Sequence, residues 1–181
     1  MTSEYAVTLA MITERELNTH ITAFAKTIGG GPLGVVQHRP EDWAQVTSCF
    51  RNVSRKIERD GGAGVFGWFF QHRVLAYNSN LGYLLAIHHA VWHDNSGRLT
   101  DVTPFHVDPK HRPYGPEGLV VFLVDPHALP ITTEQLIAPL ATKFHSLGDD
   151  ITLVRHVERL AQEEEALCQK IYQGVAEASG K

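Results

Sequence analysis

Four apolar runs separated by turn residues constrain the fold of this chain more than any other feature. The runs span residues 64–77, 82–93, 98–107 and 119–125. They are rich in aromatic and β-branched side chains, which favour strands. Asn78-Ser79-Asn80 and the Pro/Gly-rich segment 108–118 are typical of the turns and loops that separate strands. We therefore expect an antiparallel sheet of about four strands.

Helical patterns flank the predicted sheet on both sides. Residues 12–27 are expected to form a helix that ends at a run of glycines. Residues 133–178 are also expected to be helical, with helix starts at 132–135 and at Asp149-Asp150. Helices on either side of a run of strands predict an α+β fold.

The length and composition of the chain fit one globular domain. It has 181 residues, of which 43% are hydrophobic and 20% charged, so it can bury a core of its own. We expect a single domain over residues 1–181. Its core is expected at about 33–127 and a C-terminal helical segment at about 132–178.

Charge and cysteine content argue against several classes of protein. The net charge of −4 and the lack of a basic stripe give no reason to expect a nucleic-acid partner. No apolar run approaches the roughly 20 residues of a membrane-spanning helix, and the N-terminus lacks the pattern of a signal peptide. Cys49 and Cys168 are too few for a disulfide framework, which favours a reducing, cytoplasmic compartment.

One of the two cysteines lies in a helical segment that precedes the sheet. This helix should end at Gly61-Gly62, and it either runs from about Pro40 or restarts at Ser48 as a new N-cap. In the second case Cys49 stands in the first turn, where a helix N-terminus lowers the pKa of a thiol and makes it a better nucleophile. The more common role of such a cysteine is that of a small buried apolar residue.

The predicted hairpin of residues 87–105 carries imidazoles and a carboxylate within its apolar runs. Alternation along a strand puts His88 and His89 on opposite faces. With a five-residue turn over Asp94–Arg98, Asp101 lies on the face of His89 and diagonal to it. A slip of one residue in the register would exchange the two histidines.

The order of these groups resembles that of thiol hydrolases. A cysteine opens a helix, a histidine follows on a strand and an acid follows on the next strand, which is the order of nucleophile, base and orienting acid. This resembles the papain-like layout shared by papain-type proteases, transglutaminases and protein N-terminal glutamine amidohydrolases. The stretches CFRNVSRKIERDGG, Gly-Trp and HHAVW with DVTP are similar to those of small uncharacterised bacterial proteins, over roughly residues 43–105.

The resemblance implies a papain-like fold in which the cysteine-bearing helix packs on an antiparallel sheet. It also implies Cys49, His89 and Asp101 as a catalytic triad. We therefore expect a cysteine-dependent amide hydrolase, either a deamidase or amidase or a peptidase-like enzyme, that forms a covalent thioester. It would need no cofactor and would act on a protein or peptide-like amide.

Three further residues are candidates for the binding of the oxyanion or the substrate. Gln45 could donate to an oxyanion, although papain-type enzymes place this glutamine further upstream of the cysteine. Asn52 could bind the thiolate region or the substrate, or be merely exposed. Trp92 is expected in the core or in the pocket wall.

Two other classes of function remain open. The histidine-rich region could bind a metal ion in a metal-dependent hydrolase or metal-binding protein. The candidate ligands are His88, His93, His106, Asp108 and His111. Alternatively the chain is a non-catalytic partner-binding domain with the C-terminal helix as its dimer or complex interface. A homodimer through this helix is possible for the enzyme as well. Asp101, for its part, could merely cap a turn or accept backbone hydrogen bonds near Thr103.

Overall fold

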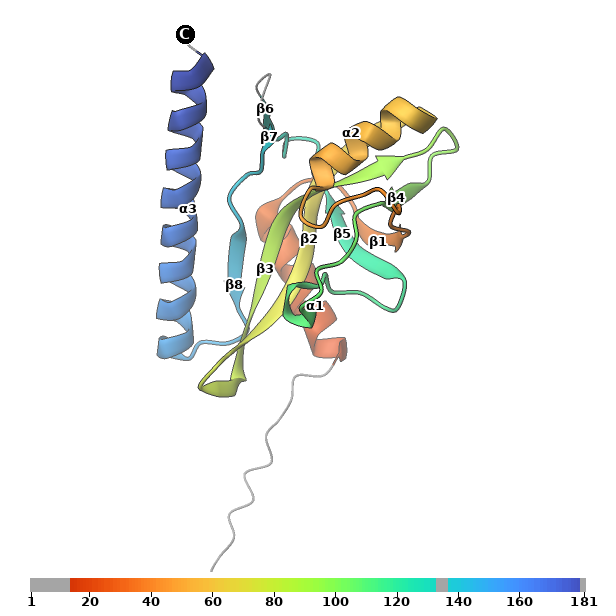
Figure 1. Cartoon of the computed structure of the whole chain (residues 1–181). Coiled ribbons are helices and arrows are strands. Elements are labelled where there is room, and N and C mark those ends of the chain that lie inside the picture. The colour runs from red at the N-terminus through yellow and green to blue at the C-terminus, as the bar shows by residue number, and fades with distance from the viewer. Residues whose placement is uncertain (1–13, 133–136, 180–181) are drawn as a thin grey trace, which may run out of the picture.

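A computed structural model describes residues 14–132 and 137–179 (Figure 1). The helices are α1 (Glu14–Ile28), α2 (Cys49–Asp60), the 3-10 helix η1 (Pro109–His111) and α3 (Ile151–Ser179). The strands are β1 (Leu33–His38), β2 (Ala63–Leu75), β3 (Asn78–His93), β4 (Leu99–Asp101), β5 (Leu119–Val124), β6 (Ile131–Thr132), β7 (Ile137–Ala138) and β8 (Lys143–Ser146). The fold is α+β, as the sequence predicts.

Six of the strands form a mixed, mostly antiparallel sheet in the order β2-β5-β1-β4-β3-β8. The two long strands β2 and β3 also pair with each other, so the sheet closes into a ring of five strands, and β8 is added outside it along β3. The pair β1–β4 is parallel. At Gly67 of β2 a side chain would collide with the backbone of Leu123 in β5, so glycine allows these two strands to pair.

The interior of the ring is filled by apolar side chains from its own strands. Val36, Val91 and Phe122 are fully buried there, and partly buried side chains from β2, β4 and β5 pack against them. Because every member of this cluster comes from a strand of the ring and none from a helix, the cluster marks the inside of the barrel.

Helices cover the outside of the ring. The apolar face of α1, with Ile21 and Phe24, packs on Trp68 and Phe70 of β2. Helix α2 packs through Val53 on β3. The first turns of α3 pack beside β8, and the remainder of this long helix extends along one side of the molecule (Figure 1).

The start of α2 decides between two alternatives that the sequence left open. Helical structure begins at Cys49, and residues 40–48 form turns and irregular loop. The restart at Ser48 is therefore the correct alternative, and the cysteine stands in the first turn of its helix.

The expected C-terminal helical segment is wrong over much of its first part. Residues 137–138 and 143–146 are strands, and 133–136 lie outside the described residues. Pro139 cannot donate a helical hydrogen bond, and β8 pairs instead with β3. The helix starts at Ile151, after Asp150, whose carboxylate accepts from the N–H groups of Thr152 and Leu153, as the second predicted start requires.

Candidate active site

The loop before α2 has a conformation that presents Cys49 at the helix N-terminus. Thr47 has φ of 63°, a left-handed conformation that a β-branched residue rarely adopts. Asn52 holds the loop, because its amide bonds both the N–H and the carbonyl of Gln45, at 3.0 and 2.8 Å. Ser48 makes no side-chain hydrogen bond to the helix, so the first-turn N–H groups of α2 are not capped by it.

The hairpin between β3 and β4 has the predicted register. Trp92 pairs with Thr100 and His93 with Leu99, and residues Asp94–Arg98 form the five-residue turn. The Asp94 carboxylate builds this turn by accepting from the backbone N–H groups of Ser96 and Arg98. Asp101 is therefore carried to the side of the hairpin on which His89 lies.

His89 and Asp101 form a buried pair. Nε2 of His89 lies 3.1 Å from Oδ1 of Asp101, and the two side chains are 6% and 1% exposed. The Asp101 oxygen does not lie along the direction of the N–H bond on Nε2, because this nitrogen has no well-aligned hydrogen-bond partner. Oδ1 of Asp101 also accepts from the N–H of Thr103 at 3.0 Å, so the backbone-binding role that the sequence allowed is present as well.

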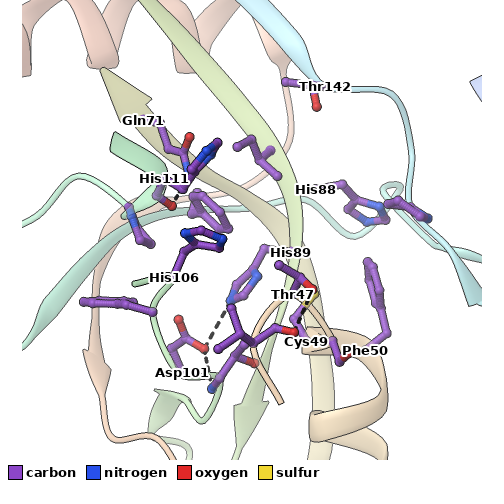
Figure 2. A pocket seen from close by; sticks show the side chains of 18 of the residues that line it. Thr47, Cys49, Phe50, Gln71, His88, His89, Asp101, His106, His111 and Thr142 are labelled. Atoms are coloured by element: carbon purple, nitrogen blue, oxygen red, sulfur yellow. Dashed lines mark hydrogen bonds and ion pairs between the residues drawn. The ribbon is translucent and has the colours of Figure 1, made fainter. Parts of the chain in front are cut away.

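The charge state of His89 is set by its two neighbours. Burial of the ring opposes a positive charge, but the Asp101 carboxylate and the Cys49 side chain outweigh burial, and they raise the pKa of His89 to about 10. The Cys49 side chain is the second cause of this shift, after Asp101. Since Nε2 faces Asp101, Nδ1 is the ring nitrogen left for the thiol. Figure 2 shows His89 between Cys49 and Asp101.

His88 points to the other face of β3 and has different partners. Its Nε2 donates to the carbonyl of Ala128 at 2.7 Å, and its Nδ1 accepts from the N–H of Leu140 at 2.8 Å. These two bonds require the neutral ring with the proton on Nε2. Burial lowers the pKa of His88 to about 4. Of the two adjacent histidines, His89 is the one that joins Cys49 and Asp101.

A cavity of about 600 Å³ lies beside Cys49 and His89. Its walls come from the start of α2, from β2 and β3, from the segment after β4 and from the segment before β8. Apolar side chains of these walls are Phe50, Phe69, Ile87, Phe105 and Leu140. The cavity gives a ligand direct access to the cysteine.

The three predicted substrate-binding residues do not line this cavity. Gln45 is exposed, and its backbone rather than its side chain makes the bonds to Asn52. The buried Asn52 amide also donates to Thr103 Oγ1, so this side chain joins the loop, α2 and the segment after Asp101. Trp92 donates to the carbonyl of Gly61, and the ammonium group of Lys56 lies over its ring. Both partners lie toward the C-terminal end of α2, whereas Cys49 is at its N-terminal end.

The candidate metal ligands are dispersed into separate interactions. The rings of His106 and His111 are 4.8 Å apart, but His106 accepts from the N–H of Asp108 and His111 contacts Arg73. His93 is the last residue of β3. Within residues 14–132 and 137–179, no three His, Cys, Asp or Glu side chains are grouped so that they could hold a metal ion.

The sequence did not indicate Thr47 as part of the site, and it indicated Thr103 only as a possible backbone partner of Asp101. The left-handed backbone of Thr47 has no sequence signal, because a threonine is a poor choice for that conformation. Thr103 had a weak signal, since it follows an aspartate by two residues, the spacing of an Asx turn.

Comparisons with known proteins add no family assignment. No protein-family model matches the chain, and neither the curated proteins nor the solved structures contain a significant match. The helices among the described residues are all too short or too polar to cross a membrane.

Proposed function

We propose that the protein is a cysteine-dependent amide hydrolase with a Cys49–His89–Asp101 triad. The observation that carries the proposal is the buried His89 ring, which interacts with the cysteine at a helix N-terminus and with a carboxylate. The raised pKa of His89 favours an imidazolium beside the sulfur, which is the charge arrangement of an activated thiol nucleophile.

The proposed reaction has two steps. Sγ of Cys49 attacks the amide carbon, and the C–N bond breaks as His89 delivers a proton from Nδ1 to the leaving amine, which leaves a thioester. Water then attacks the thioester carbon while His89 accepts a proton from it, the C–S bond breaks, and the carboxylic acid leaves as Cys49 and the protonated His89 are regenerated. Asp101 holds Nε2 of the ring in the protonated form throughout.

The oxyanion would be stabilised by the start of α2. The backbone N–H of Cys49 is in the first helical turn, and the dipole of the 12-residue helix α2 favours negative charge there. The exposed position of Gln45 gives no support to its role as a second donor. A cavity side chain or a second N–H of the loop would take that place.

The proposal includes a papain-like arrangement and a reducing compartment. A cysteine-bearing helix that packs on a closed, mostly antiparallel sheet agrees with the first. Both cysteines are free and buried, which agrees with the second. A cytoplasmic location fits a nucleophilic thiol because oxidation would inactivate it.

The test is the rate of alkylation by iodoacetamide at pH 6, followed by mass spectrometry of the Cys49 peptide. An ordinary thiol with pKa near 8.5 is only about 0.3% thiolate at this pH. We expect Cys49 to react at least about tenfold faster than a free thiol, and His89→Asn to abolish this advantage. Cys168→Ser is the matched control and should leave the rate unchanged. A wild-type rate no higher than that of a free thiol would refute the proposed chemistry.

A further inference from the structure

One edge of β3 is unpaired beside the nucleophile. On one side β3 pairs with β2 along nearly its whole length, including residues 87–91. On the other side it pairs with β8 only at residues 83–86 and with β4 only at 92–93. Within the described part of the chain, no backbone hydrogen bond reaches 87–91 from that second side.

The cavity lies along this unpaired edge. Successive side chains of a strand point to opposite faces, so a cavity on one face would be lined by alternate residues. Here three successive residues, Ile87, His88 and His89, all line the cavity. A cavity in contact with both faces of a strand must lie at its edge, where the backbone N–H and C=O groups are directed.

Side chains hold the neighbouring segment away from the edge. If the β3–β8 register continued, Thr142 would stand opposite Ile87 and Leu140 opposite His89. Instead the N–H of Thr142 donates to Glu164 of α3, and the N–H of Leu140 donates to His88. These two bonds hold residues 140–142 in a position where they do not continue the β3–β8 ladder.

A third bond fixes the same segment. The hydroxyl of Tyr172, also on α3, donates to the carbonyl of Pro139 at 2.7 Å. The neutral His88 and the long C-terminal helix therefore hold the segment before β8, and β3 is left without a partner between the residues that pair with β8 and those that pair with β4.

We propose that the substrate is an extended polypeptide segment that pairs as an added strand with the edge of β3 at Ile87–His89. This inference rests on the proposed function of Cys49. Unpaired backbone groups at a buried edge are satisfied by another backbone, and a strand added there gains affinity from main-chain hydrogen bonds. The apolar side chains of the cavity wall would receive the substrate side chains that alternate out of the strand.

This mode of binding explains the position of the catalytic groups. His89 lies on the edge itself, so a strand paired there runs past the imidazole and the adjacent thiol. The carbonyl that Cys49 attacks would be a main-chain or side-chain amide of this strand. Free amino-acid amides and other small amides lack the neighbouring peptide groups, and they would be poor substrates.

The test compares peptidyl chloromethyl ketones as labels of Cys49. The probes are acetyl-alanyl chloromethyl ketone, its tetra-alanyl analogue, and tetra-alanyl versions with one N-methylated amide each. We expect the second-order labelling rate to rise at least about tenfold from one residue to four. N-methylation should remove this gain at alternate positions only, because alternate N–H groups of an added strand face its partner.

Hydrogen exchange gives a second readout. Labelling by the tetra-alanyl probe, but not by the mono-alanyl probe, should slow exchange of an amide within residues 87–89. Equal labelling rates for the two probes, or no effect of N-methylation at any position, would overturn the inference. If such a result occurs while iodoacetamide still reacts rapidly with Cys49, the edge-pairing mode fails and the proposed hydrolase chemistry stands.

Discussion

Replacing Asp101, the proposed orienting acid, with asparagine separates the charge of this side chain from its shape. Asp101 is 1% exposed, and its Oδ1 both accepts from Thr103 and faces His89. An asparagine at this position would keep an oxygen for the Thr103 N–H and would fill the same volume. The Asp101→Asn variant should therefore fold, and the change should act mainly on the charge state of His89.

The size of the effect follows from the separation of the two charges. The contacting atoms are 3.1 Å apart, which puts the centres of the two charged groups further apart. At about 4 Å and an effective dielectric constant of about 20, the attraction is roughly 4 kcal/mol. One pKa unit corresponds to about 1.4 kcal/mol, so the pKa of His89, about 10 in the wild type, should fall by roughly 3 units.

The assay is a pH titration of imidazole ¹⁵N chemical shifts, with the His89 resonance identified by its loss in His89→Asn. We expect a transition near 10 in the wild type and one roughly 3 units lower in Asp101→Asn. A His89 transition at or below the ordinary value of 6.5 in the wild type would refute the assigned electrostatics. Equal transitions in wild type and variant would show that Asp101 is not the source of the shift.

Stability and reactivity should change with other residues in predictable ways. The pKa of His88 is lowered to about 4, so acidification from 6.5 to 4 should cost up to about 3 kcal/mol in the free energy of unfolding, because the unfolded chain binds the proton first. The pKa of His89 is raised to about 10, so the free energy of unfolding should also fall as pH rises from 6.5 to 10. Urea unfolding at a series of pH values should therefore show maximum stability near pH 6.5. A stability that changes in one direction only across this range would contradict both assignments. Thr47→Gly should raise the free energy of unfolding by about 1 kcal/mol, because glycine adopts the left-handed backbone of this position without strain, whereas Thr47→Val should not raise it. Equal urea midpoints for Thr47→Gly and the wild type would show that the loop is unstrained.

Local chemistry allowed the hairpin register to be predicted and limited the start of α2 to two alternatives. Asp94 and Gly97 fix a five-residue turn, and the turn in turn fixes which side of the hairpin carries Asp101. Ser48 was a possible N-cap by residue type, and the helix does begin after it, although its side chain makes no capping bond.

The closure of the sheet could not be predicted in the same way. Strands β1 and β8 are short, and they are held by partners far away in the sequence. No turn signal near residues 33–38 indicates pairing with residues 119–123. The contacts of Asn52 could not be predicted for the same reason, since its amide donates to Thr103, 51 positions away.

The order of the strands has a consequence for the synthesis of the protein. Strand β1 immediately precedes the cysteine loop, but its partners are β4 and β5, and Leu33 pairs with Leu123. A ribosome therefore produces Cys49 long before the ring can close around His89, and such distant pairings form slowly. On the proposed function, the nascent chain carries only an ordinary thiol, and the site that would activate it is assembled after the last strand of the ring has emerged.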